Sequence, residues 1–145
     1  MIVRVSTNLP IDAAAGMELL RKPALLRHIM RGLLGFRGEL PDRWPGIGGS
    51  VTVRLWFFGV LPAWKHTIYI VEADDTHLKT NEHGGFIRAW DHEARFQPLG
   101  PARCRYTDTI EIDAGWLTPL VVAWAHMQYR VRQRRWRQLA AVLNP

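Results

Sequence analysis

The C-terminal stretch of the chain, residues 119–143, reads PLVVAWAHMQYRVRQRRWRQLAAVL, and no glycine or second proline interrupts it. Thr118 supplies a hydroxyl suited to a helix N-cap, and Pro119 is suited to the first helical position. At about 1.5 Å per residue, the helix predicted here is roughly 37 Å long, about the width of a small domain. We therefore expect the remainder of the chain to pack around this helix.

Two stripes of side chains follow the predicted helix at helical spacing. The first is mostly apolar and comprises Leu117, Leu120, Val121, Trp124, Met127, Gln128, Val131, Gln138 and Val142. The second is basic and comprises Arg130, Arg134 and Arg137. An apolar stripe of this kind is normally buried against other elements. We expect the first stripe to face the strands, with a functional space left between helix and strands.

The rest of the chain predicts a strand, two short helices and an antiparallel meander, because alternating segments are separated by turn residues. The predicted strands are residues 2–7, 36–40, 50–58, 64–72, 77–83, 86–97 and 103–113, and the predicted helices are 12–22 and 24–34. A sheet of this size must bury one face, and only the C-terminal helix is long enough to cover it. We predict an α+β fold in which a strongly bent antiparallel sheet wraps around the long C-terminal α-helix, with a cavity between them.

The composition is that of an ordinary globular protein, with 48% hydrophobic and 22% charged residues over 145 positions, and we expect one domain, residues 1–145. Cys104 is the only cysteine, so an internal disulfide or cysteine-based zinc site is impossible, and we expect it to be buried. The histidines lack zinc-type spacing, so we expect no metal or other cofactor. The absence of signal-peptide features and the single cysteine predict a cytoplasmic protein.

The net charge of +6 is concentrated at one end of the chain, because residues 115–145 contain five arginines and no acidic residue. Cations near a helix C-terminus are favoured by the helix dipole, so a solvated helix end is one interpretation. A patch for an acidic partner or anionic lipid is another. Nothing resembling a recognition helix accompanies the arginines, and we do not expect nucleic acid as a partner. No run of 18 apolar residues occurs, so stable membrane insertion is not expected.

Two adjacent predicted strands carry charged residues on otherwise apolar faces. Strict alternation groups Phe86, Arg88, Trp90, His92, Ala94 and Phe96 on one strand, and Cys104, Tyr106, Asp108, Ile110 and Ile112 on the next. Charged groups in such places cost free energy unless they are paired or used. His92 and Asp108 are therefore expected either to form a buried pair that fixes strand register or to act together, with Asp108 orienting His92 as a general base or polar anchor. By contrast, Glu82 and His83 are expected at a solvated turn.

Three motifs carry a resemblance to a known family. They are Pro62-x-Trp64-x-His66, then Gly85-Phe86-x-x-x-Trp90-x-His92-x-x-x-Phe96-x-Pro98, then Tyr106-Thr107-Asp108-x-Ile110-x-Ile112. Over nearly its whole length the chain resembles the small SRPBCC proteins, the superfamily of START and Bet v 1-like ligand-binding proteins that includes polyketide cyclases and aromatases. The resemblance implies a helix-grip fold with an internal cavity for hydrophobic ligands. The family pattern often has a second histidine where this chain has Ala94.

The resemblance and the strand faces together suggest which residues meet a ligand. They are Trp56, Trp64, Arg88, Trp90, Phe96, Tyr106, Ile110, Leu120, Trp124 and Met127. The first hypothesis is binding or carriage of a lipid, isoprenoid or polyketide-like aromatic. The second is a cyclase or dehydratase in which His92 and Asp108 are catalytic and move protons. The third is an interaction module that uses the basic helix end. The apolar segment 120–125 also makes a homodimer possible.

Overall fold

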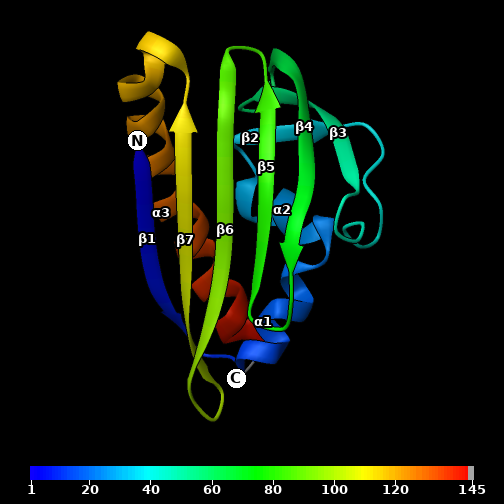
Figure 1. Ribbon diagram of the computed structural model, residues 1–145. Coiled ribbons are helices and arrows are strands. Elements are labelled where there is room, and N and C mark those ends of the chain that lie inside the picture. Colours follow the sequence, from blue (N-terminus) through cyan, green and yellow to red (C-terminus); the bar gives the residue numbers. More distant parts are fainter. Residues whose placement is uncertain (144–145) are drawn as a thin grey trace.

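The computed structural model describes residues 1–143, which form one curved sheet and three α-helices (Figure 1). The strands are β1 (Ile2–Leu9), β2 (Leu34–Arg37), β3 (Ser50–Phe57), β4 (Leu61–Ala73), β5 (His77–Gly84), β6 (Ile87–Gly100) and β7 (Arg103–Asp113). The helices are α1 (Ala13–Leu20), α2 (Pro23–Met30) and α3 (Thr118–Leu143). All neighbouring strands are antiparallel, in the order β1-β7-β6-β5-β4-β3-β2. The predicted α+β architecture, a bent sheet gripping a long C-terminal helix, is confirmed.

The long helix begins one residue earlier than predicted, at Thr118. The Thr118 hydroxyl accepts a hydrogen bond from the Ala114 N–H at 2.9 Å and donates one to the Gly115 carbonyl at 2.7 Å. It therefore ties the helix to the short 3-10 turn Gly115–Leu117 rather than satisfying a helical N–H group. Figure 1 shows α3 passing behind the sheet from the end of β7 toward α1.

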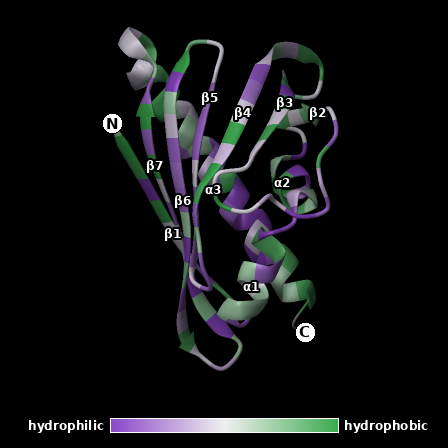
Figure 2. Cartoon of the chain, turned by 45° about the vertical axis from the view of Figure 1, so that its right-hand side comes forward, coloured by the Kyte–Doolittle hydropathy of each residue, from purple (hydrophilic) through white to green (hydrophobic). Residues whose placement is uncertain are grey.

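The buried face of α3 differs from the predicted stripe. It comprises Val121, Ala125, Gln128, Tyr129, Arg132, Gln133, Trp136 and Ala140. Leu120, Met127 and Val142 are exposed instead. Polar contacts set the rotation of α3 about its own axis, because the Gln133 amide donates to the Val5 carbonyl at 2.7 Å. The middle of α3 is correspondingly hydrophilic (Figure 2).

The two short helices and the second strand are shorter than predicted, whereas β1 extends two residues beyond its predicted end, to Leu9. The second helix ends at Met30 rather than residue 34, because Gly32 adopts a φ of 78° and the Leu33 N–H bonds back to the Met30 carbonyl. A left-handed conformation suits glycine and terminates the helix before Gly35. The chain then enters β2 at Leu34, two residues ahead of the predicted strand.

A bulge between β5 and β6 corrects the predicted face of the β6 segment. Glu82 pairs with Trp90 and Gly84 pairs with Ile87, so β6 has one extra residue between Ile87 and Trp90 and alternation is broken there. Ile87 and Trp90 are both buried, whereas Phe86 and Arg88 are exposed. From Trp90 onward the prediction holds, and all five residues assigned to the inner face of β7 are buried. A bulge adds one residue to a strand and therefore reverses the facing of everything on one side of it.

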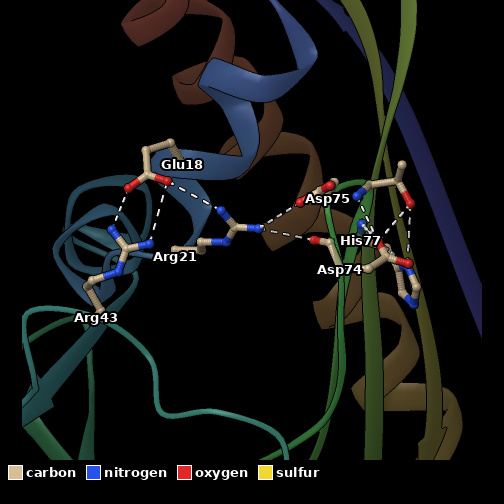
Figure 3. Close-up of polar contacts among 7 residues, drawn as sticks. Glu18, Arg21, Arg43, Asp74, Asp75 and His77 are labelled. Carbon is tan, nitrogen blue, oxygen red and sulfur yellow. Dashed lines mark hydrogen bonds and ion pairs between the residues drawn. The ribbon is translucent and has the colours of Figure 1, made fainter.

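A network of exposed ion pairs fastens α1 to two loops (Figure 3). Glu18 pairs with both Arg21 and Arg43, and the Arg21 guanidinium reaches Asp75 at 3.7 Å in the turn between β4 and β5. In that turn Asp74 accepts hydrogen bonds from Thr76 and His77, which keep the pKa of its carboxyl well below the usual range. The network holds the segment before β3 against α1.

The sheet and helices enclose a solid core next to α1. The rings of Phe96, Tyr106 and Trp136 pack with centroids 4.9 to 5.8 Å apart. Gly16 of α1 lies directly on this group, since a Cβ built there would overlap the Phe96 ring. The glycine therefore sets how closely α1 approaches β6.

Gly16→Ala tests that packing. Overpacking costs about 1–3 kcal/mol and the gain in helix propensity is at most about 1 kcal/mol, so we expect a net loss of about 1–2 kcal/mol in unfolding free energy. Urea denaturation followed by tryptophan fluorescence measures it. Gly46→Ala is the control, because a Cβ there meets nothing within 4 Å. Equal stability of the two variants would contradict the packing described.

Candidate functional site

A cavity of about 500 Å³ lies between α2, α3 and strands β3 to β6. This volume is within the range of small-molecule sites in proteins. One end is mainly aliphatic and is lined by Leu20, Leu25, Leu26, Ile29, Met30 and Leu34, together with the rings of Phe36 and Trp44. The other end is aromatic and is lined by Phe57, Trp64, Phe86, Trp90, Trp124 and Tyr129. The polar lining residues are Lys22, His66, Thr80, Glu82, His92, Gln128 and Arg132.

The aromatic end is held by edge-to-face contacts. Trp64 contacts Phe86 and Phe57 with ring centroids 5.0 and 5.6 Å apart, and Phe57 contacts Trp124 at 6.1 Å. The Trp64 ring covers Gly84 and Gly85, where an added Cβ would lie 2.6 Å from a ring carbon. The Gly84-Gly85 pair at the end of β5 therefore leaves room for the Trp64 ring, which forms a wall of the cavity.

Behind one wall, the Asp108 carboxylate collects three hydrogen bonds. It accepts from His92 Nε2 and from the Tyr106 hydroxyl, both at 2.7 Å, and from the Gln133 amide at 3.0 Å. Asp108 is fully buried, whereas His92 lines the cavity. Because an ionised carboxylate only accepts, His92 Nε2 carries the proton toward Asp108. Asp108 therefore fixes the orientation of His92 from outside the cavity.

The charge of Asp108 follows from these partners. Burial raises the pKa of its carboxyl, but the hydrogen bond and charge of His92, the charge of Arg132 and the Tyr106 hydroxyl together lower the pKa below its ordinary value. The same carboxylate and burial raise the pKa of the Tyr106 hydroxyl, which stays protonated and donates.

A second polar group lies on β4 and β5. His66 Nε2 is 3.0 Å from a Glu82 oxygen, and Thr80 donates to the other Glu82 oxygen at 2.8 Å. The Trp64 indole N–H donates to His66 Nδ1 at 3.3 Å, so Nδ1 is the acceptor and Nε2–H donates to Glu82. Burial raises the pKa of Glu82, but the hydrogen bond and proximity of His66 outweigh it and lower the pKa.

The prediction that Glu82 is solvated is wrong. Strand β5 continues to Gly84, and regular alternation puts Glu82 on the same face as Leu78 and Thr80, so its side chain lies on the cavity wall beside His66. His83 is exposed, as predicted, and stacks on Tyr69 with ring centroids 5.7 Å apart.

Arg132 brings a cation to the cavity from α3. Its side chain is buried, with a relative exposure of 6%, and its guanidinium carbon lies 4.4 Å from the centroid of the Tyr129 ring. Burial lowers the pKa of Arg132, but the neighbouring tyrosines, Asp108 and Glu82 raise it above its ordinary value, so the guanidinium is charged. Burial also raises the pKa of Tyr129, whose hydroxyl accepts from the Trp90 indole N–H at 3.3 Å.

The structure places five of the predicted site residues on the cavity wall, namely Trp64, Trp90, His92, Leu120 and Trp124. Leu120 is 70% exposed and belongs to the mouth. The residues that do not line the cavity are Trp56, Arg88, Phe96, Tyr106, Asp108, Ile110 and Met127.

Packing elsewhere or an outward orientation explains why these side chains do not line the cavity. Phe96 and Tyr106 fill the solid core, and Ile110 packs in a second core cluster with Val3 and Ala125. Trp56 faces away from Leu55 and Phe57, and the Arg37 guanidinium lies 3.7 Å above its ring. Arg88 is turned outward by the bulge, and Met127 lies on the outer face of α3.

Sequence reasoning missed the contributions of α2 and of the inward polar residues. His66 and Glu82 are far apart in sequence, and only the β4–β5 register brings them together. Arg132 is one of five arginines in residues 115–145, and the sequence did not distinguish it from the other four. Helical spacing offered one signal, because Arg132 is four residues from Gln128, which the predicted stripe already included.

Two further expectations concern absent features. Within residues 1–143, no three His, Cys, Asp or Glu side chains are grouped so that they could hold a metal ion. No helix in the same part of the chain has the length and apolarity needed to cross a membrane.

Cys104 is buried as predicted, and burial together with Asp12 raises the pKa of its thiol to about 11.

Comparisons with solved structures place the fold. A START superfamily protein from Mycobacterium smegmatis superposes with a TM-score of 0.70 at 13% identity, covering 98% of each chain. Norcoclaurine synthase from Thalictrum flavum, solved with dopamine and hydroxybenzaldehyde, gives 0.67 at 13% identity over 97% of this chain and 86% of its own. An aromatase/cyclase from a Streptomyces species gives 0.63 at 15% identity over 97% of this chain and 93% of its own.

These similarities define the class of fold. The chain has the helix-grip fold of START and Bet v 1-like proteins, and the predicted resemblance to SRPBCC proteins is confirmed at this level. No protein-family model matches the sequence, and no curated protein matches it either.

Asp108→Asn tests the buried network. The amide nitrogen cannot accept a hydrogen bond, so at least one of the three donors loses its partner. A hydrogen bond to a charged group contributes about 1.5–3 kcal/mol, and we expect a loss of that order in unfolding free energy at pH 7. Glu111→Gln, on the exposed face of the same strand, should change it by less than about 0.5 kcal/mol. If urea titrations give similar values for both, the network does not stabilise the fold.

The lowered pKa values of Asp108 and Glu82 predict the direction of a pH dependence. Unfolded Asp and Glu titrate near about 3.9 and 4.3, and the folded carboxyls titrate lower, so the unfolded chain binds more protons in acid. Their contribution is therefore complete above about pH 5 and is lost as pH falls through the folded-state pKa values. Urea denaturation from pH 3 to 7 should show this loss. The loss of unfolding free energy should be smaller in Glu82→Gln than in the wild type. If the unfolding free energy of both proteins falls equally with pH, Glu82 does not contribute as described.

Proposed function

We propose that the protein binds or carries a small hydrophobic molecule in the cavity between the sheet and α3. The observation that carries the proposal is the cavity itself, about 500 Å³ in volume, with an aliphatic end and an aromatic end. Burying roughly 200 Å² of apolar ligand surface contributes on the order of 5 kcal/mol before the costs of association. A lipid, an isoprenoid or a polyketide-like aromatic fits these walls.

The mouth of the cavity supports passage of such a ligand. Leu120 on α3 and Phe86 after β5 line the cavity and are also exposed. Phe58, also exposed, contacts Trp124 edge to face with centroids 6.1 Å apart. Exposed apolar side chains that continue into a pocket are typical of an entrance for an apolar molecule.

A cyclase or dehydratase function is the second candidate, and His92 favours it. Its imidazole lines the cavity and is oriented by Asp108, which is the arrangement that a general base requires. Asp108 would be a positioning residue, because it is fully buried and its oxygens accept three hydrogen bonds. Recovery of a chemically altered ligand, abolished in His92→Phe, would favour catalysis over carriage.

The interaction-module hypothesis has less support. Of the five arginines of α3, Arg132 is buried, Arg135 donates to the Ile29 carbonyl at 2.9 Å, and Arg137 donates to the Thr7 hydroxyl at 2.7 Å. Arg135 therefore holds α3 against α2, and Arg137 holds it against β1. The basic surface available to a partner is smaller than the sequence suggests.

Binding is tested with the neutral fluorescent probe N-phenyl-1-naphthylamine. We expect saturable binding to the wild type and at least about fivefold weaker binding to Ala123→Trp, because the new ring enters the cavity mouth. Ala141→Trp is the matched control, an exposed alanine of α3 away from the cavity. Native mass spectrometry of freshly purified protein measures the mass of any ligand that copurifies with it. A wild type that does not bind the probe would refute the proposal.

A further inference from the structure

The cavity contains a charged donor that the protein itself does not satisfy. The relative exposure of Arg132 is only 6%, and its Nε has no hydrogen-bond partner. In the structure of residues 1–143, the guanidinium forms neither a hydrogen bond nor an ion pair with another side chain or the backbone, and its one close partner is the Tyr129 ring. A buried guanidinium without acceptors is costly, and its N–H groups are strong, fixed donors.

The neighbouring carboxylates do not supply the missing acceptor. Asp108 accepts from His92, Tyr106 and Gln133, and Glu82 accepts from His66 and Thr80. Both carboxylates are near enough to favour the charged form of Arg132, but their hydrogen bonds are directed to other donors.

The other arginines of α3 provide a contrast within the same helix. Arg135 and Arg137 each donate to an oxygen of the protein, on α2 and β1 respectively. Arg132 lies between them and the cavity's aromatic end, lines the cavity, and has no such oxygen. The fold therefore provides acceptors for the buried or bridging arginines of this helix except for the one that faces the ligand space.

We propose that the ligand is an amphipathic monoanion, a hydrophobic carboxylic acid whose carboxylate accepts hydrogen bonds from the Arg132 guanidinium inside the cavity. This inference rests on the proposed binding function and narrows its ligand class. The guanidinium presents a planar fork that matches a carboxylate, and charge-assisted pairs of this kind are among the stronger hydrogen bonds. The apolar walls take the rest of the molecule.

The surroundings favour one negative charge over two. Asp108 and Glu82 already place two carboxylates near Arg132, so a dianion such as a phosphate monoester meets like-charge repulsion in a low-dielectric cavity. A monoanion needs only one buried cation, and Arg132 supplies it, whereas Lys22, which also lines the cavity, is exposed. Hydrocarbon or aromatic acids are therefore expected to bind better than neutral or dianionic analogues of the same size.

The test compares decanoic acid with decan-1-ol at pH 7.5, each displacing N-phenyl-1-naphthylamine. In the wild type the acid should bind at least about tenfold more tightly, the factor expected of a charge-assisted hydrogen bond. In Arg132→Met the ratio of the two affinities, acid to alcohol, should fall to within about twofold, each affinity being measured against the probe's own affinity for that variant. Arg134→Met removes the same charge from an exposed position and should leave the preference intact.

The outcomes separate the two proposals. If the wild type does not bind the neutral probe, the binding function itself fails. If it binds the probe but the acid and the alcohol displace it equally, the binding function stands and the assignment of Arg132 is overturned. A preference that survives in Arg132→Met, or is lost in Arg134→Met, overturns it as well. Should Arg132→Met not fold, Arg132→Lys replaces it, and a weakened preference for the acid is expected.

Discussion

The structure depends on one buried carboxylate. Asp108 on β7 is hydrogen-bonded to His92 on β6 and to Gln133 on α3, and the same Gln133 amide bonds the Val5 carbonyl of β1. Four elements therefore meet at one charge. A buried ionised group must be matched by fixed donors, so the helix can take only the rotation that presents Gln133 to Asp108. This constraint explains why exposed leucine and methionine are tolerated on α3.

The cavity exists because α3 packs against only one side of the curved sheet. α3 packs on β1, β7 and α2, whereas β3 to β5 curve away from it. Near α1, the rings of Phe96, Tyr106 and Trp136 fill the interior. Farther along, no element fills the space between the curved strands and α2, and the cavity occupies it. A sheet bent by bulges and anchored along one side encloses volume that a flat sheet would not.

The polar groups of the cavity differ in how completely the protein satisfies them. His66 and Glu82 pair with each other, and His92 pairs with Asp108, so these groups are largely satisfied before any ligand enters. Among the buried charged groups of this lining in residues 1–143, Arg132 lacks such a partner. In an apolar site, a few polar groups fix the orientation of a ligand, and the unsatisfied one contributes most to selectivity.

The class of fold and most of the inner faces of β6 and β7 can be predicted from the amino-acid pattern alone. Period-two alternation marks buried residues such as Trp90 and Tyr106 wherever a strand is regular, and an uninterrupted run of 25 residues can only be a long helix. The amino-acid pattern did not determine the rotation of α3, the outward turn of Arg88, or the pairing of His66 with Glu82. These three features depend on the folded chain, because a bulge, a strand register and a buried hydrogen bond each arise from contacts between distant segments. For the same reason, which arginine of α3 enters the cavity is decided by the position of Asp108 on another element and not by the helix's own sequence.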